Sequence, residues 1–128
     1  MRLARSSSGA ELLQWFGLFA AALAWTGQLV IGFGVSDAAC SAGSARWGID
    51  VHAWLIGLTA AGALAALVAE AAATVLFLET RDAGEDGPPP WGRRHFFAAT
   101  ALLGNVLFLA VILLTGFGTL AHSPCVQS

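Results

Sequence analysis

The sequence predicts an all-α integral membrane protein, a three-helix bundle with its N-terminus inside the cell and its C-terminus outside. Three observations lead to this fold class. Hydrophobic residues make up 57% of the 128 residues and charged residues only 11%, whereas a soluble domain usually carries about 25% charged residues. Three long apolar runs are separated by two polar connections. The arginines are divided unevenly between the two sides that this pattern defines.

Each apolar run is long enough to cross a bilayer. The first run, 12–35, has no charged residue and spans about 36 Å as a helix, against a hydrocarbon core of about 30 Å. The second run, 51–78, contains one charge, Glu70, and the third, 96–121, contains none. The runs are apolar on all sides, and the backbone must satisfy its own hydrogen bonds in lipid. We therefore expect three transmembrane helices.

The connections between the runs set the expected orientation. Residues 36–50 are rich in serine, glycine and alanine, whereas 79–95 contains three consecutive prolines, which end helices. Five arginines lie in the N-terminal segment and in 79–95, and only one lies in 36–50. Positively charged segments stay in the cytoplasm, so 79–95 is the predicted cytoplasmic loop and 36–50 the predicted outer loop. Residues 1–128 thus form a single multi-pass domain, expected in the bacterial inner membrane with the lipid bilayer around it.

The first run has an alternative interpretation as a cleaved signal. A basic start and the sequence DAAC, which ends at Cys40, are compatible with a lipoprotein signal. However, the run is longer than the 7–15 apolar residues of a signal peptide. Asp37 also stands where such a cleavage site normally has an aliphatic residue. We expect the first helix to be retained.

The two cysteines, Cys40 and Cys125, each follow a predicted span and fall on the predicted outer face. That compartment is oxidising in bacteria, which favours a disulfide between the first and third helices. Such a bridge would close a loop of about 85 residues and stabilise the fold by about 4–5 kcal/mol. The alternative is a thiol pair for redox exchange or metal transfer, which no CxxC spacing supports.

Two histidines, His52 and His122, also lie at the predicted outer ends of the second and third helices. Together with the cysteines they have the ligand types of a copper or zinc cluster, and the histidines alone those of a haem site. No spacing motif accompanies them, and a histidine at a membrane interface usually bonds to water or headgroups. We therefore predict no metal and no cofactor, and keep His52 and His122 as candidate ligands only.

Glu70 is the one charged residue within the predicted spans. It lies about nine residues from the cytoplasmic end of its run, and Asn105 lies about ten from the same end of the third run. The two are thus expected at similar depth, where the Asn amide can hydrogen-bond to the carboxyl group. A charged carboxylate at mid-helix costs about 2.5–3.5 kcal/mol. We interpret the pair as a polar clamp between helices; the alternative is a proton relay or an ion-binding carboxylate.

Gln28 is the polar residue in the outer half of the first run. Its amide is expected to bond to a neighbouring helix or to another subunit. Small residues four positions apart, Gly17 with Ala21 and Gly62 with Ala66, favour close approach of helices. These features predict how the bundle is held together, not a reaction.

Several short motifs occur in a characteristic order along the chain. Trp15–Phe16–Gly17 and Ala24–Trp25–x–x–Gln28 lie in the first run, and a cysteine follows it. A histidine then begins the second run, a loop with proline and arginine leads to the third, and Pro124–Cys125 lies near the end. This order resembles a group of small three-span bacterial membrane proteins of unknown function, often encoded near haem–copper cytochrome c oxidase genes. The resemblance covers nearly the whole chain and implies an accessory or assembly role.

The motifs that are absent from the sequence also bear on function. There is no phosphate-binding loop, dinucleotide glycine motif, nucleophile elbow or HExxH element, so we do not expect an enzyme. The net charge of −2 gives no reason to expect nucleic acid as a partner. The expected function is that of a non-enzymatic accessory or assembly factor for a respiratory complex such as cytochrome c oxidase. The alternatives are a small oligomeric proton or ion transporter using Glu70, and an outer-face metal or haem carrier; the oligomeric state is left open.

Overall fold

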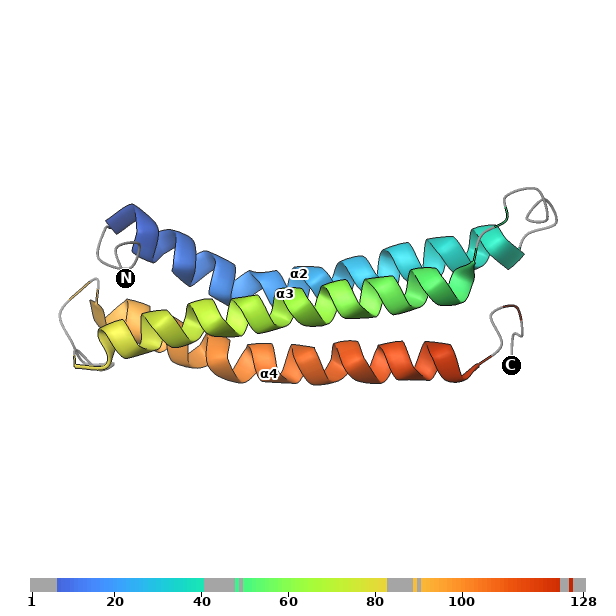
Figure 1. Cartoon of the computed structure of the whole chain (residues 1–128). Coiled ribbons are helices and arrows are strands. Elements are labelled where there is room, and N and C mark those ends of the chain that lie inside the picture. Colours follow the sequence, from blue (N-terminus) through green and yellow to red (C-terminus); the bar gives the residue numbers. More distant parts are fainter. Residues whose placement is uncertain are drawn as a thin grey trace.

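The computed structural model of the chain contains three long α-helices and, in the residues that it describes, no strand. The described residues are 7–40, 48, 50–82, 89, 91–122 and 125. The helices are α2 (Ser7–Cys40), α3 (Val51–Thr80) and α4 (Trp91–Ala121). They lie side by side and alternate in direction, so that α2 and α4 run parallel (Figure 1). The all-α three-helix prediction is confirmed.

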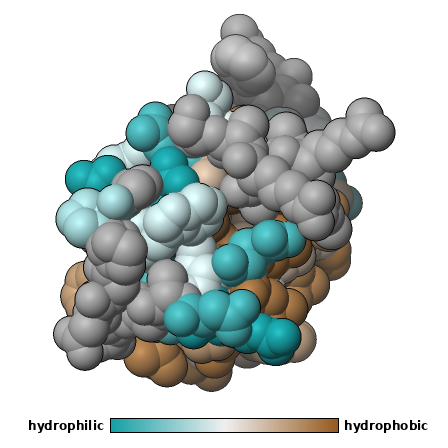
Figure 2. All heavy atoms as spheres, turned by 90° about the vertical axis from the view of Figure 1, so that its left-hand side faces the viewer, coloured by the Kyte–Doolittle hydropathy of each residue, from teal (hydrophilic) through white to brown (hydrophobic). Residues whose placement is uncertain are grey.

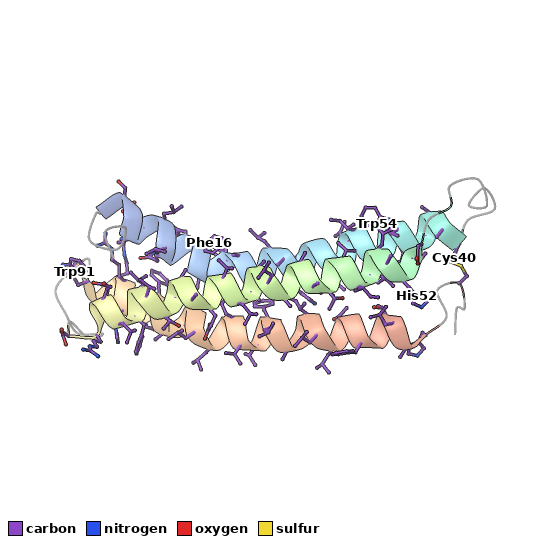
Figure 3. All side chains as sticks on the ribbon, in the orientation of Figure 1. Phe16, Cys40, His52, Trp54 and Trp91 are labelled. Carbon is purple, nitrogen blue, oxygen red and sulfur yellow. A yellow bond between two sulfur atoms is a disulfide. The ribbon has the colours of Figure 1, made fainter. Side chains whose placement is uncertain are left out.

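The two ends of this elongated bundle differ and are named here by their residues. The disulfide end carries Cys40 and Cys125. The Trp91 end is where α3 ends and α4 begins. In Figure 3, Trp91 and Phe16 lie towards one end, and Cys40, His52 and Trp54 lie at the other.

All three helices are long and apolar enough to cross a membrane. Their outward faces are covered by large apolar side chains, of which Leu23, Phe33 and Leu103 are 69%, 77% and 73% exposed. An apolar surface of this extent is unsuited to water but matches hydrocarbon. Figure 2 looks onto the Trp91 end, where hydrophilic residues face the viewer and hydrophobic residues form the lower flank. The chain is a multi-pass membrane protein.

The helices extend beyond the apolar runs, and both predicted connections are shorter than expected. Helix α2 continues through Asp37 to Cys40, inside the predicted outer loop 36–50. Helix α4 begins at Trp91, inside the predicted cytoplasmic loop 79–95. Charged residues at a membrane surface do not interrupt a helix, whereas prolines do, so α4 begins directly after the proline run. The start of α3 is capped by Asp50, whose side chain accepts a 3.2 Å hydrogen bond from the backbone N–H of Ala53.

The core between the helices consists mainly of small residues. One buried cluster joins all three helices through Ala21, Ala66, Ala69 and Ile112. A second, nearer the Trp91 end, comprises Ala10, Leu76 and Ala98. Helices α2 and α3 lie close together at Gly17, where an added Cβ would lie 3.3 Å from the backbone nitrogen of Ala73. Without a hydrophobic force between helices in lipid, such close packing supplies much of the attraction.

Candidate functional site

Cys40, the last residue of α2, and Cys125, beyond the end of α4, form a disulfide with an S–S distance of 2.05 Å. The predicted pairing is therefore present. The bridge spans a sequence separation of 85 residues, for which the chain-entropy relation gives a stabilisation of about 4–5 kcal/mol. Because both sulfurs are oxidised, neither acts as a thiolate nucleophile or metal ligand in this state.

The two candidate histidine ligands lie at the same end of the bundle as the disulfide. His52 is exposed in the first turn of α3 (Figure 3). His122, also exposed, has its Nδ1 atom 2.7 Å from the carbonyl oxygen of Gly118 in its own last turn. Within the described parts of the chain, no three His, Cys, Asp or Glu side chains gather as a metal-binding group. With the disulfide formed, the alternative of a copper or zinc cluster thus lacks its two sulfur ligands.

Gln28 connects α2 to both other helices. Its Nε2 atom donates to Thr59 Oγ1 on α3 and to the carbonyl oxygen of Ile112 on α4, both at 3.2 Å. Thr59 in turn donates to the carbonyl oxygen of Leu55 at 2.8 Å. The partners of Gln28 Nε2 are therefore helices of the same chain. We call Gln28, Thr59 and Ile112 the Gln28 cluster.

A glycine makes room for this cluster. At Gly116 of α4, an added Cβ would lie 3.0 Å from the Cβ of Thr59 and would overlap its hydroxyl and methyl groups. Helix α4 can thus approach Thr59 only because residue 116 has no side chain. Beside the Gln28 cluster is a cavity of about 220 Å³, lined by residues of all three helices.

Asn105 joins the helices nearer the Trp91 end. Its side chain is only 2% exposed, and its Nδ2 atom donates to the carbonyl oxygen of Gly17 at 2.8 Å. The Asn105 side chain also reaches the carboxyl group of Glu70, so the two residues share one depth, as the sequence predicts. Glu70 itself is half-buried, and its Oε2 atom is buried without a hydrogen-bond partner. The predicted polar clamp between Glu70 of α3 and Asn105 of α4 therefore also joins α4 to the backbone of α2.

The Trp91 end holds polar groups that the sequence placed in a loop or at an interface. Thr80 Oγ1 lies 3.1 Å from Nδ1 of His95, whose ring stacks on Phe77 with a centroid separation of 4.6 Å. Arg94 is only 5% exposed and lies 5.2 Å from the centroid of the Trp91 ring. Its Nε atom is buried without a hydrogen-bond partner. The first turns of α4 thus pack into the bundle.

Three contributors to these clusters are not predicted by the sequence patterns. They are Thr59, Gly116 and the carbonyl oxygen of Gly17. A threonine in the sequence does not by itself indicate a bond between helices. In a membrane helix its hydroxyl usually bonds to a carbonyl one turn earlier, as those of Thr26, Thr74 and Thr100 do here. The spacing of Gly17 with Ala21 predicts a close approach of helices there, whereas the close approach at Gly116 depends on helix rotation, which an apolar helix does not reveal.

No protein-family model, curated protein or solved structure matches this chain.

Proposed function

We propose that this protein is a non-enzymatic accessory subunit or assembly factor that packs laterally against a larger membrane complex. The observation that carries the proposal is a set of helical glycines that make no close contact with another helix of the bundle. At five described glycines within the helices, an added Cβ would meet no neighbouring atom within 4 Å: Gly27, Gly34, Gly57, Gly104 and Gly118. Each weakens its helix by about 0.8–1.0 kcal/mol relative to alanine. In lipid, exposed glycines allow another helix to approach closely.

Gly57 marks the face that we assign to the partner. It lies on α3 in a shallow, open depression with Ala53, Trp54 and Leu58. The Trp54 side chain is 51% exposed and lies towards the disulfide end (Figure 3). Small residues let a partner backbone come near, while an exposed tryptophan offers a large contact area of the kind that interfaces favour.

The proposed partner is a respiratory complex, with cytochrome c oxidase as the first candidate. This choice rests on the resemblance of the motif order to small membrane proteins encoded near oxidase genes. The internal ties of the bundle support a scaffold role, because the disulfide, the Gln28 cluster and Asn105 each hold separate helices together. A bundle that is held in this way presents a fixed outer surface to a neighbour.

Co-purification from native membranes in a mild detergent tests this proposal. We expect tagged protein to retain oxidase subunits, identified by mass spectrometry, and Gly57→Leu to lower their yield about tenfold, equivalent to about 1.4 kcal/mol. Gly104→Leu is the matched control, because an added Cβ at residue 104 also meets no neighbouring atom within 4 Å but lies on α4, away from the depression assigned to the partner. A chain that elutes without oxidase subunits, or equal yields from both variants, would contradict the proposal.

A second candidate function, proton or ion transport by an oligomer, is favoured by one observation. Glu70 Oε2 is buried within a membrane span and has no hydrogen-bond partner. A carboxyl group in this setting is costly and often lies on an ion pathway. Flux into liposomes that contain the purified protein decides this candidate. Transport predicts that Glu70→Gln abolishes flux while the exposed control Glu11→Gln does not; absence of flux in the unaltered protein removes the idea.

A further inference from the structure

The cavity beside Gln28 lies in the half of the bundle near the disulfide. Its polar lining comes from Gln28 and Ser36 of α2, Thr59 of α3, and Thr115 and Thr119 of α4. Apolar side chains form most of the remaining wall, and Phe33 at its edge is 77% exposed on the lipid-facing surface. No charged side chain lines it. The cavity is thus a neutral recess with hydroxyl groups on its wall, open towards the lipid.

Gln28 determines which hydrogen-bonding group an occupant of the recess needs. The side chain is only 7% exposed, yet its Oε1 atom is buried without a hydrogen-bond partner. The orientation of the amide is fixed, because its nitrogen faces the carbonyl oxygen of Ile112, which can only accept. Turning the amide over would place two oxygens against each other. The missing partner of Gln28 must therefore be a hydrogen-bond donor.

The volume and lining of the recess restrict the kind of molecule that can carry this donor. A volume of about 220 Å³ is several times the roughly 30 Å³ that one water occupies in the liquid. A single water would leave most of the apolar wall uncovered, whereas an acyl chain would cover the wall but bring no donor. Because no charged side chain is available to pair with an ion, the occupant must be neutral.

We propose that this recess binds a lipid-soluble molecule that joins a hydroxyl group to an apolar body. Its O–H donates to Gln28 Oε1, and its apolar part lies along Leu29 and Phe33 towards the bilayer. Thr115 of α4 also lines the recess, and its hydroxyl can donate to the oxygen of the bound hydroxyl. This site is separate from the partner-binding face assigned to Gly57.

Photolabelling in phosphatidylcholine liposomes tests the proposal. The probe is hexadecanol carrying a diazirine on its chain, and its methyl ether, which lacks the donor, is the control probe. We expect the alcohol to label the α2 and α4 walls at least about fivefold more than the ether, the ratio expected for one hydrogen bond. Unlabelled hexadecanol and a hydroquinone with a hydrocarbon tail serve as separate competitors. Displacement by either supports the site and identifies an aliphatic or an aromatic hydroxyl as the better ligand.

Variants connect labelling to the recess. Gln28→Leu should lower alcohol labelling to the level of the ether. Since Gln28 also holds the helices together, Ser36→Leu provides a second test by filling the recess without removing a bond of the Gln28 cluster. Thr26→Leu is its control, because Thr26 is exposed on the same helix and bonds only to its own backbone. Gel migration with and without reductant reports whether each variant still forms its disulfide.

Two results would overturn the proposal. Equal labelling by alcohol and ether would mean that an ordinary acyl chain or water occupies the recess. Unchanged alcohol labelling in Gln28→Leu or Ser36→Leu, with the disulfide intact, would place the labelled site elsewhere. Neither result bears on co-purification with oxidase subunits, so this proposal and the accessory function can fail independently.

Discussion

The half of the bundle near the disulfide and the half near Trp91 are held together in different ways. The first has a covalent bridge and the Gln28 cluster, and it contains a cavity of about 220 Å³. The second has the close contact of Gly17 with Ala73 and the hydrogen bond of Asn105 to the Gly17 carbonyl. The half near the disulfide thus combines a covalent tie and one close contact, of Gly116 with Thr59, with an open cavity beside them. The half near Trp91 has no disulfide and relies on close backbone approach and on interhelical hydrogen bonds.

Among the changes that test this comparison, breaking the disulfide should have the largest effect on stability. We expect Cys40→Ser to lower the free energy of unfolding by about 4–5 kcal/mol, because the unfolded chain loses its 85-residue constraint. Thermal unfolding in detergent, followed by circular dichroism, measures the loss. Reduction of the unaltered protein is the matched control and should give the same shift.

The same variant also tests the division into halves. Amide hydrogen exchange should rise most in the last turns of α2 and α4, which also lose their local tie, and less around Gly17. A uniform rise along all three helices would show that the bridge stabilises both halves equally, contrary to the comparison.

The next largest effect is expected from Gly116→Ala. The new methyl group would overlap Thr59 and push α4 away from the Gln28 cluster, at a cost of about 1–3 kcal/mol for overpacking. Gly118→Ala is the matched control, because an added Cβ there meets no atom within 4 Å. That control should be neutral or slightly stabilising, since alanine favours helix. Equal unfolding temperatures for the two variants would contradict the close packing at Gly116.

The smallest effect is expected from Asn105→Leu in the other half. This substitution removes the interhelical hydrogen bond to Gly17, and such bonds in membrane proteins contribute about 0.6 kcal/mol on average. Thr100→Val is the control, because Thr100 bonds only to the carbonyl of Phe96 in its own helix. Denaturation of both variants in mixed micelles measures the difference. A loss as large as that of the disulfide would mean that the polar bond, not close packing, holds this half.

The sequence predicts the length of each helix and the depth of its side chains in the membrane better than the rotation of the helix about its axis. Counting residues from the helix ends places Glu70 opposite Asn105, and the structure has the same register, since Thr59 faces Gly116 and Thr80 faces His95. The cysteine pairing was predictable because both cysteines follow spans on one side. These predictions need only the helix ends and the direction of the chain.

What the sequence could not predict depends on which side of each helix faces inward. Gly17, Gly62 and Gly116 each contact a neighbouring helix, whereas Gly27 and Gly104 contact none. The four-residue spacing of Gly17 with Ala21 and of Gly62 with Ala66 predicts two of these close approaches, and both are confirmed. The approach at Gly116 has no such pattern, because the helices are apolar on all sides. The recess beside Gln28 depends on the same rotation. The start of α4 at Trp91, earlier than the predicted start at residue 96, has another reason: the charged residues that follow the prolines lie within the helix.

Cysteine labelling in sealed, right-side-out vesicles tests the three-span, covalently bridged architecture most directly. The reagent is a membrane-impermeant maleimide, and Glu11→Cys adds a reporter near the start of α2. We predict no labelling of Cys40 or Cys125 before reduction, labelling of both after reduction, and labelling of the reporter only after the vesicles are permeabilised. Labelling of either native cysteine before reduction, or of the reporter in intact vesicles, would contradict the account.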